Sequence, residues 1–237
     1  MQVKDSVALV TGANRGIGRA IVDALLAAGA AKVYAGARNP DAAGFADRRV
    51  VPVQLDVADR ASIARLPQLV ADVRILINNA GVLSFGDSLQ EAVEDVERQF
   101  TVNYFGPMLT VRALAPVIEA NGGGAIVNVG SIVSLASMPA IAGYSASKAA
   151  LLSLTQAQRG SLAKSGISVH AVLPGPVDTG MTVDFPVSKA SPADVARAVV
   201  AGMVAGDAYI TPDSMAVQVY DGWRQDHRAV EAQFAAM

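Results

Sequence analysis

The sequence predicts an α/β protein in which a doubly wound parallel sheet is covered by helices on both faces. Three observations predict this fold. Short apolar runs alternate with helical patterns, a glycine-rich turn follows the first run, and hydrophobic residues, mostly Ala, Val, Ile and Leu, make up 52% of the chain. Such strands are typical of parallel sheets buried on both faces. No linker divides the 237 residues, so we expect a single domain, 1–237.

The elements follow one another in a regular order. Strands are expected where short apolar runs are bounded by turn residues, at Val7–Val10, Ala31–Gly36, Val50–Leu55, Arg74–Ile77, Gly124–Val129, Ile167–Leu173 and Ala208–Thr211. Helices are expected between them, at Gly16–Ala28, Asp59–Ala71, Ser88–Val102, Gly106–Ala120, Tyr144–Lys164 and Pro192–Ala205. Crossovers between parallel strands are right-handed, so this alternation predicts a sheet with helices on both faces.

A stripe of five residues predicts an added amphipathic helix at the C-terminus. Val219, Trp223, His227, Val230 and Phe234 recur at steps of 4, 4, 3 and 4 residues and share one helix face. Such a stripe most often packs against the protein body or a second subunit. Because it holds the only tryptophan, a wall of the substrate pocket is the alternative.

Composition excludes several function classes. The net charge is −2 without any block of like charge, which argues against a nucleic-acid surface. The chain has no cysteine, and its two histidines, His170 and His227, stand in no ligand-like cluster, so no metal site is expected. His170 lies in an apolar strand and is expected to be a core residue. No apolar run is long enough to span a membrane and no leader is visible, so we expect a cytoplasmic protein.

The turn after the first strand suits a dinucleotide. Gly12 permits a tight turn, Gly16 allows the backbone to approach a pyrophosphate, and Gly18 allows close contact between helix and strand. The helix that follows offers unpaired N–H groups and a positive dipole to phosphate. The glycine spacing is G-x-x-x-G-x-G rather than the more familiar G-x-G-x-x-G.

The end of the second strand indicates which dinucleotide binds. A fold that selects NAD places a carboxylate there for the ribose 2′-hydroxyl, but this chain has Ala37 and Arg38. Arg38, twenty residues after Gly18, and Arg15 in the glycine turn could grip a 2′-phosphate by bidentate hydrogen bonds. The sequence therefore favours NADP(H) over NAD(H). The missing acid also argues against a methyltransferase that uses S-adenosylmethionine.

A tyrosine and a lysine are spaced for proton transfer. Tyr144 and Lys148 stand four residues apart on a predicted helix and share a face. A free phenol titrates near pH ~10, and a fixed positive charge beside it should lower that pKa toward the working range. Ser131 lies thirteen residues upstream of the tyrosine. Ser145 and Ser147 point to other faces of that helix, and Ser134 is expected to be a loop hydroxyl, with contact to the substrate as the alternative.

These features stand in an order that resembles the classical short-chain dehydrogenase/reductase family. The matching motifs are the turn Thr11–Gly18 with Asn14, Arg15 and Ile17, then Asn78-Asn79-Ala80-Gly81, Asn103, Ser131, Tyr144 with Lys148, and Pro174-Gly175-Pro176-Val177-Asp178-Thr179. The resemblance covers most of the chain, Val7–Thr211. It implies a Rossmann-like fold that binds a nicotinamide dinucleotide.

The resemblance also implies a catalytic group. Tyr144 is expected to exchange a proton with the substrate oxygen, and Ser131 is expected to hydrogen-bond that oxygen. Lys148 is expected to hold the nicotinamide ribose and to lower the pKa of the tyrosine. Asn103 is expected to anchor a water that links Lys148 to solvent.

The expected cofactor contacts lie along the carboxyl edge of the sheet. They are Gly12, Asn14, Arg15, Gly16, Ile17, Gly18, Arg38, Asp56, Val57, Asn79, Ala80, Gly81, Tyr144, Lys148, Pro174, Gly175, Val177 and Thr179. By the resemblance, Asp56 and Val57 lie beside the adenine, and Val177 and Thr179 lie beside the nicotinamide carboxamide.

The predicted activity is an NADP(H)-dependent interconversion of a ketone or aldehyde and an alcohol, with a small molecule as substrate. The alternative is a dinucleotide-binding sensor or regulatory protein without catalysis. Such proteins usually lose the tyrosine or the lysine, and both Tyr144 and Lys148 are present.

The chain departs from the family pattern in two places. Only residues 180–190 separate Thr179 from the next helix, which is expected to start with Ser191 as its cap and Pro192 at its first position. A lid this short suggests a bulky or loosely specified substrate. Relatives that form tetramers end on a glycine-containing strand, whereas here a helix follows. We expect a homodimer through the helices from Gly106 and Tyr144, with a tetramer as the alternative.

Overall fold

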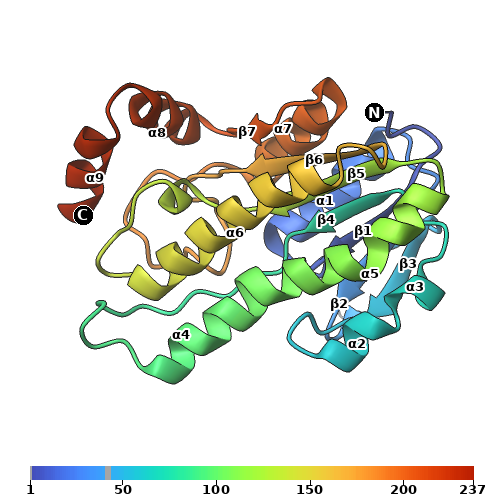
Figure 1. The fold of residues 1–237 in the computed structure, drawn as a ribbon, viewed down its shortest axis with the longest axis horizontal. Helices are drawn as coiled ribbons and strands as arrows, with labels where there is room; N and C mark the ends of the chain where they lie inside the picture. The colour runs from blue at the N-terminus through green and yellow to red at the C-terminus, as the bar shows by residue number, and fades with distance from the viewer. Residues whose placement is uncertain (1, 41–43) are drawn as a thin grey trace.

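A computed structural model describes residues 2–40 and 44–237, and Met1 and residues 41–43 lie outside that description. Within it, seven strands form one parallel sheet in the order β3-β2-β1-β4-β5-β6-β7 (Figure 1). Their bounds are β1 Val7–Thr11, β2 Lys32–Ala37, β3 Val50–Gln54, β4 Ile75–Asn78, β5 Gly124–Val129, β6 Ile167–Val172 and β7 Tyr209–Ile210. The order reverses between β1 and β4, where sheets of this kind bind their ligands.

Helices cover both faces of the sheet, which confirms the predicted fold class. The helices α1 (Gly16–Ala27) and α7 (Pro192–Ala205) pack against each other on one face. The helices α5 (Gly106–Ala120) and α6 (Ala142–Ser161) lie on the other (Figure 1). The sheet has an apolar core on each face. Ile75 and Ile77 of β4 belong to one core and Leu76 to the other, because the side chains of a strand alternate between its faces. This explains why the strand reads as a continuous apolar run.

Two of the helices expected between strands are divided or shortened in the structure. The helix predicted at Asp59–Ala71 is divided into α2 (Arg60–Ala64) and α3 (Leu66–Leu69), because Pro67 has no N–H with which to continue the first helix. The helix predicted at Ser88–Val102 begins only at Val93. It forms α4 (Val93–Phe100) and passes through a π turn, η2 (Thr101–Phe105), directly into α5.

The single C-terminal helix predicted from the stripe is wrong, because Asp226 breaks it. The backbone of Asp226 is extended, with φ −149° and ψ 92°, and it separates α8 (Ser214–Gln225) from α9 (His227–Ala235). Its Oδ1 accepts hydrogen bonds from Arg228 N at 3.0 Å and Ala229 N at 3.1 Å and so caps α9. The apolar periodicity predicted one continuous helix, but capping by Asp226 ends α8 and starts α9.

The stripe packs against the body at three of its five positions. Val219, Val230 and Phe234 are buried in one apolar cluster that also contains Tyr144. Trp223 and His227 are exposed. The C-terminal helices therefore lie over the end of the sheet where α6 begins (Figure 1). No helix in the described residues combines the length and apolar character needed to cross a bilayer.

Candidate active site

The glycine turn between β1 and α1 has the backbone that the sequence predicts. Gly12 and Gly16 have positive φ values of 65° and 54°, which favour glycine. A Cβ at Gly18 would lie 2.2 Å from the carbonyl oxygen of Gly12, so α1 can approach the turn only because this side chain is missing. Asn14 lies in the same turn and Ile17 in the first turn of α1, whose first N–H groups lack intrahelical acceptors. The turn fits a pyrophosphate.

Thr11 and Asn79 join the ends of β1 and β4. The Thr11 hydroxyl accepts hydrogen bonds from the backbone N–H groups of Asn79 and Ala80, both at 3.0 Å. Asn79 Nδ2 donates to the carbonyl oxygens of Thr11 at 2.9 Å and Gly12 at 3.2 Å. These hydrogen bonds hold the loop after β1 and the loop after β4 together, at the place where the strand order reverses. The sequence motif included Asn79 and Ala80 but did not assign this role to Thr11.

The remaining cofactor candidates line the same edge of the sheet. Asp56 and Val57 follow β3, with Asp56 Oδ1 accepting a hydrogen bond from Ala58 N at 2.9 Å. Arg38 follows β2 directly and is exposed. Arg15 is also exposed, and its Nη1 lies 3.8 Å from the position that a Cβ of Gly180 would take. The Arg15 side chain therefore lies beside the segment that follows Thr179.

The segment after β6 closes the other side of the cleft. The methyl carbon of Thr179 lies 3.1 Å from the position of a Cβ on Gly16, so this segment touches the glycine turn. Gly175 N donates a hydrogen bond to Asp213 Oδ2 at 2.9 Å, and Asp213 Oδ1 accepts one from Ala216 N at 2.8 Å. Asp213 thus has two roles: it caps α8, and it holds the segment after β6 in place through Gly175. No role was predicted for Asp213 from the sequence, although a polar cap after Pro212 is a helix-start signal.

Tyr144 and Lys148 lie side by side on α6, as their spacing predicts. Lys148 Nζ is 5.7 Å from the centroid of the Tyr144 ring. The lysine is buried, with 3% of its surface exposed, and Nζ donates a hydrogen bond to the Val129 carbonyl oxygen at 2.7 Å. An ammonium has three N–H donors. The other two are directed to no acceptor among the described residues and fit the ribose hydroxyls of a nicotinamide dinucleotide.

The pKa of the Tyr144 phenol departs from the expectation. Burial raises the pKa of the Tyr144 phenol to about 12, and a hydrogen bond from Ser131 only partly opposes this. The sequence predicted the opposite direction, and it did not account for the cost of burying a phenolate. Burial also lowers the pKa of Lys148 to about 8. In the protein alone, the phenol is therefore protonated at neutral pH.

Ser131 stands where β5 gives way to a short 3₁₀ turn, η3 (Ile132–Ser134). Its Oγ accepts a hydrogen bond from Val133 N at 3.3 Å and caps this turn. Ser134 Oγ accepts one from the Ser131 N–H at 3.3 Å, which completes a capping box. The two hydroxyls thus fix the loop that presents Ser131 to Tyr144. Ser134, expected to be a loop hydroxyl, supports this geometry.

Asn103 lies fully buried in the π turn, and π turns often occur at functional sites. Its Nδ2 donates hydrogen bonds to Val82 O and Ser147 Oγ, both at 2.9 Å, and its Oδ1 accepts one from Val82 N at 2.9 Å. Ser147 Oγ donates in turn to the Tyr144 carbonyl oxygen at 2.7 Å. Ser147 thus links Asn103 to α6, a role that the sequence did not indicate.

A carboxylate caps the helix that carries Tyr144. Glu91 Oε2 accepts a hydrogen bond from Gly143 N at 2.9 Å, and Glu91 Oε1 accepts one from Gln99 Nε2 at 2.6 Å. Side chains at Gly86 and Gly143 would lie 2.6 Å from Glu91 atoms, so both glycines leave room for it. A negative charge at a helix N-terminus is stabilising. Glu91 lies in the stretch predicted to be helical, where its contact with α6 could not be foreseen.

Replacing Glu91 with Ala is expected to destabilise the protein by about 1–3 kcal/mol, because it leaves the buried Gln99 amide and the Gly143 N–H without their acceptor. A looser start of α6 should also lower kcat by about tenfold. Urea denaturation and steady-state kinetics measure both effects. The matched control is Glu94→Ala, which removes an exposed acid in the first turn of α4. Equal effects of the two substitutions would refute the capping role.

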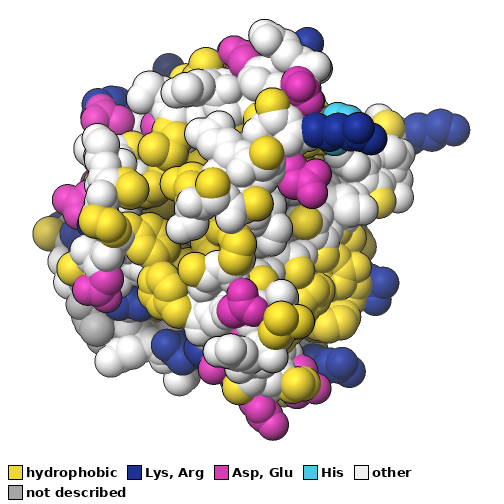
Figure 2. All heavy atoms as spheres, turned by 90° about the vertical axis from the view of Figure 1, so that its left-hand side faces the viewer, with side chains coloured by type: hydrophobic (Ala, Val, Ile, Leu, Met, Phe, Trp, Pro, Cys, Tyr) yellow, Lys and Arg dark blue, Asp and Glu magenta, His cyan; other side chains and the backbone are white. Residues whose placement is uncertain are grey.

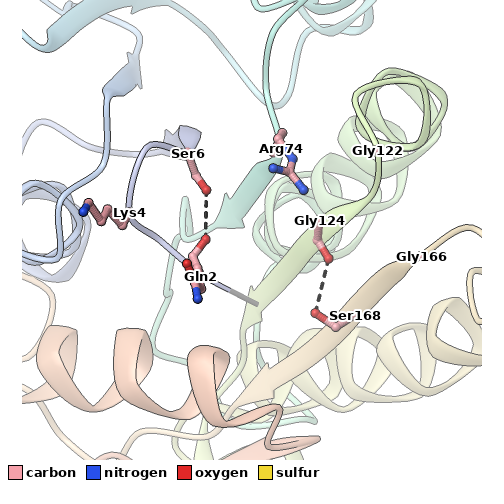
Figure 3. Close-up of a pocket in the computed structure, with 8 residues that line it drawn as sticks. All are labelled: Gln2, Lys4, Ser6, Arg74, Gly122, Gly124, Gly166 and Ser168. Atoms are coloured by element: carbon pink, nitrogen blue, oxygen red, sulfur yellow. Dashed lines mark hydrogen bonds between the residues drawn. The ribbon is translucent and has the colours of Figure 1, made fainter.

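A polar hollow at the opposite edge of the sheet is not the active site. It encloses ≈ 450 Å³ and is lined by Gln2, Lys4, Ser6, Arg74, Gly122, Gly124, Gly166 and Ser168 (Figure 3). Ser6 Oγ donates to Gln2 O at 2.9 Å and Ser168 Oγ donates to Gly124 O at 3.3 Å. These residues lie at the amino ends of the strands, away from Tyr144.

His170 is a core residue, as expected. It is buried on β6, and its two ring nitrogens are hydrogen-bonded to Asp207 O at 2.7 Å and Ser168 Oγ at 2.8 Å. Burial is the main cause that lowers its pKa, which keeps the ring neutral.

Comparison with known proteins identifies relatives of this arrangement. A family model described as short chain dehydrogenase matches residues 6–189. The chain is 36% identical over 186 residues to a galactitol 2-dehydrogenase of Agrobacterium fabrum, covering 75% of this chain and 73% of that protein. It is 35% identical over 184 residues to a 3-alpha-(or 20-beta)-hydroxysteroid dehydrogenase of Mycobacterium bovis, covering 74% and 70%.

Solved structures extend the similarity to nearly the whole chain. A short chain dehydrogenase of Burkholderia cenocepacia in complex with NADP has a TM-score of 0.94 and 38% identity, and 99% of each chain is covered. A short chain dehydrogenase/reductase of Burkholderia phymatum in complex with NAD has a TM-score of 0.84 and 25% identity, covering 97% of this chain and 96% of that one.

Proposed function

The chain belongs to the short-chain dehydrogenase/reductase family of oxidoreductases, and from this premise we propose that it interconverts a ketone or aldehyde and an alcohol with NADP(H). One observation carries the proposal. Tyr144, Lys148 and Ser131 lie together, with Lys148 Nζ 3.6 Å from the position that a Cβ of Gly81 would take, in a site where the phenol keeps its proton at neutral pH. A protonated phenol is the form that a carbonyl reduction requires.

The bound cofactor would supply a hydride to the carbonyl carbon. Negative charge then develops on the carbonyl oxygen, and the Tyr144 hydroxyl transfers its proton to that oxygen. The Ser131 hydroxyl donates a hydrogen bond to the same oxygen and stabilises the charge while it builds up. The Lys148 ammonium stabilises the phenolate that remains on Tyr144. Hydride and proton together convert the carbonyl into an alcohol, and the reverse order of events oxidises the alcohol.

The relatives support the reaction class without fixing the substrate. The polyol and hydroxysteroid dehydrogenases among them are named for substrates that carry a secondary alcohol. Their difference in polarity shows that the family likeness alone does not select a substrate for this chain. The sensor alternative has no specific observation in its favour, since Tyr144 and Lys148 are both present and buried.

We further propose that NADP(H) is preferred. The support is the pair of exposed arginines, Arg15 at the glycine turn and Arg38 at the end of β2, with no acid at that strand end. Guanidinium groups bind phosphate by charge-assisted, bidentate hydrogen bonds. A relative in complex with NADP, at 38% identity, is consistent with this preference, while a more distant one holds NAD.

The cofactor proposal predicts that kcat/KM with NADPH exceeds that with NADH roughly 10- to 100-fold. Arg38→Asp should reverse the order, because a carboxylate repels a 2′-phosphate and accepts a hydrogen bond from a 2′-hydroxyl. The control is Arg48→Asp, which makes the same charge change at an exposed position before β3. A wild-type preference for NADH would overturn the assignment of Arg15 and Arg38.

A homodimer is the proposed assembly. The surface of α4 and the π turn carries an apolar groove of ≈ 360 Å³ lined by Val93, Val96, Phe100 and Phe105, among others. Val93 is 66% exposed and Phe105 is 43% exposed, which is costly in a monomer. The lining of the groove ends at Phe105, directly before α5, which is one of the two helices from which the sequence predicted a dimer face. The single-domain organisation and the cytoplasmic location stay predictions.

A further inference from the structure

Two aromatic side chains from distant loops contact each other. The rings of Phe85 and Phe185 pack edge to face, with centroids 5.5 Å apart and planes at 82°. Phe85 is 58% exposed, although it is a large apolar side chain. The two residues come from loops a hundred positions apart in the sequence. Such a contact holds two loops together and leaves one apolar surface free for a ligand.

The loop of Phe85 is fastened to the start of the catalytic helix. Gly86 N donates a hydrogen bond to Ala140 O at 2.9 Å, and Gly86 forms an isolated parallel bridge with Ile141. Ile141 immediately precedes α6 and lies three residues before Tyr144. Phe85 is therefore held at a fixed position relative to the phenol.

The loop of Phe185 is fastened to the cofactor segment. Thr182 Oγ1 donates a hydrogen bond to the Val177 carbonyl oxygen, and Phe185 N donates to Thr182 O at 3.0 Å. Val177 lies two residues before Thr179, which touches the glycine turn. The Phe85–Phe185 contact therefore spans the cleft from the Tyr144 side to the cofactor side. A substrate that reaches Tyr144 between the two loops passes this pair.

Several apolar side chains lie near the pair. Met181 and Val183 on the second loop are 39% and 67% exposed. Met138 and Met215 pack partly buried on the apolar cluster that contains Tyr144. Figure 2 shows the side of the molecule that lies at the left of Figure 1, where hydrophobic side chains gather across the middle with some acidic side chains among them. The nearest acids in sequence, Asp87 and Asp184, are exposed.

We propose that Phe85 and Phe185 form an aromatic clasp that selects an apolar carbonyl substrate, aryl or alkyl, over a polyol or sugar. This inference rests on the proposed function and names its substrate class. A polyol needs a hydrogen-bond partner for each hydroxyl that leaves water, and an apolar wall supplies none. An aryl group instead packs against the ring faces and the thioethers. The clasp thus determines specificity, while proton transfer stays with Tyr144.

The first test compares substrates in the wild-type protein. With NADPH, kcat/KM for an aryl ketone such as acetophenone should exceed that for a sugar ketone such as fructose by about 100-fold or more. Equal or better turnover of the sugar ketone would overturn the clasp and leave the proposed reaction standing. An absence of turnover with any carbonyl or alcohol would instead overturn the proposed function itself.

The second test is a double-mutant cycle on the clasp. Phe85→Ala and Phe185→Ala should each lower kcat/KM for the aryl ketone by about tenfold, through KM more than kcat, and the double variant should be little worse than either. Turnover of a small polar ketone such as dihydroxyacetone should stay near that of the wild type. The control is Leu89→Ala, at a side chain 91% exposed on the first loop. Full additivity, or equal loss on both ketones, would refute the clasp.

Discussion

Replacing Tyr144 with Phe is expected to lower kcat for ketone reduction about 1,000-fold, within the range that general acids contribute. The substitution removes only the hydroxyl, which accepts a hydrogen bond from Ser131, and keeps the ring in its apolar cluster. The fold and the loops after β1 and β4 should therefore survive. Fluorescence titration should give an NADPH dissociation constant within about threefold of the wild type, since the change lies in the transition state.

The matched control for this prediction is Tyr220→Phe on α8, which removes a phenolic hydroxyl from a half-buried ring outside the catalytic group. Its kcat should stay close to that of the wild type. If Tyr144→Phe reduced ketones as fast as Tyr220→Phe, another group would have to supply the proton, and the role of Tyr144 would be lost.

Replacing Lys148 with Met is expected to abolish turnover and also to change how stability depends on pH. The lysine is buried, and its pKa falls from the ordinary 10.5 to about 8 in the folded protein. Above pH 8, the folded protein therefore loses a proton that the unfolded chain still holds. Because the unfolded state binds more protons in this window, the stability of the wild type rises with pH there.

Lys148→Met lacks this titration. Between pH 7 and pH 9.5, the free energy of unfolding of the wild type should therefore rise by about 2 kcal/mol relative to that of the variant. Urea denaturation at several pH values measures the difference. The series stops at pH 9.5 because Tyr144 acts in the opposite direction above pH 10. Its pKa is raised to about 12, so there the folded state keeps a proton that the unfolded chain releases.

Lys164→Met is the matched control, because it removes an exposed lysine just after α6. It should leave the pH dependence of stability as in the wild type. A flat difference between the wild type and Lys148→Met across this pH range would mean that Lys148 is not held in a desolvated site. The proposed contact between its ammonium and a ribose would then lose its electrostatic basis.

Much of the fold follows from local patterns in the sequence. Apolar runs such as the one within Arg74–Ile77 predicted buried strands, and β4 is observed there at Ile75–Asn78. The glycines at 12, 16 and 18 predicted the turn, because backbone geometry leaves little choice there. The Tyr144–Lys148 pair was predictable for the same reason, since residues four apart on a helix share a face. These inferences depend on neighbours in the chain.

The rest depends on contacts between distant segments. Glu91 caps a helix 52 residues further on, and Asp213 holds a loop 38 residues earlier, and neither distance has a sequence signature. The break at Asp226 was missed because a regular stripe hid a helix cap. The direction of the Tyr144 pKa was missed because burial is a property of the whole fold.

The central claim is that Tyr144 donates the proton to the carbonyl oxygen when a nicotinamide transfers its hydride to the carbonyl carbon. Reduction of an aryl ketone with NADPH deuterated at the transferred position tests it most directly, with the product examined by mass spectrometry. We predict an alcohol with one deuterium on its carbinol carbon from the wild type, formed about 1,000-fold more slowly by Tyr144→Phe. An unlabelled alcohol, or equal rates from the two proteins, would contradict the account.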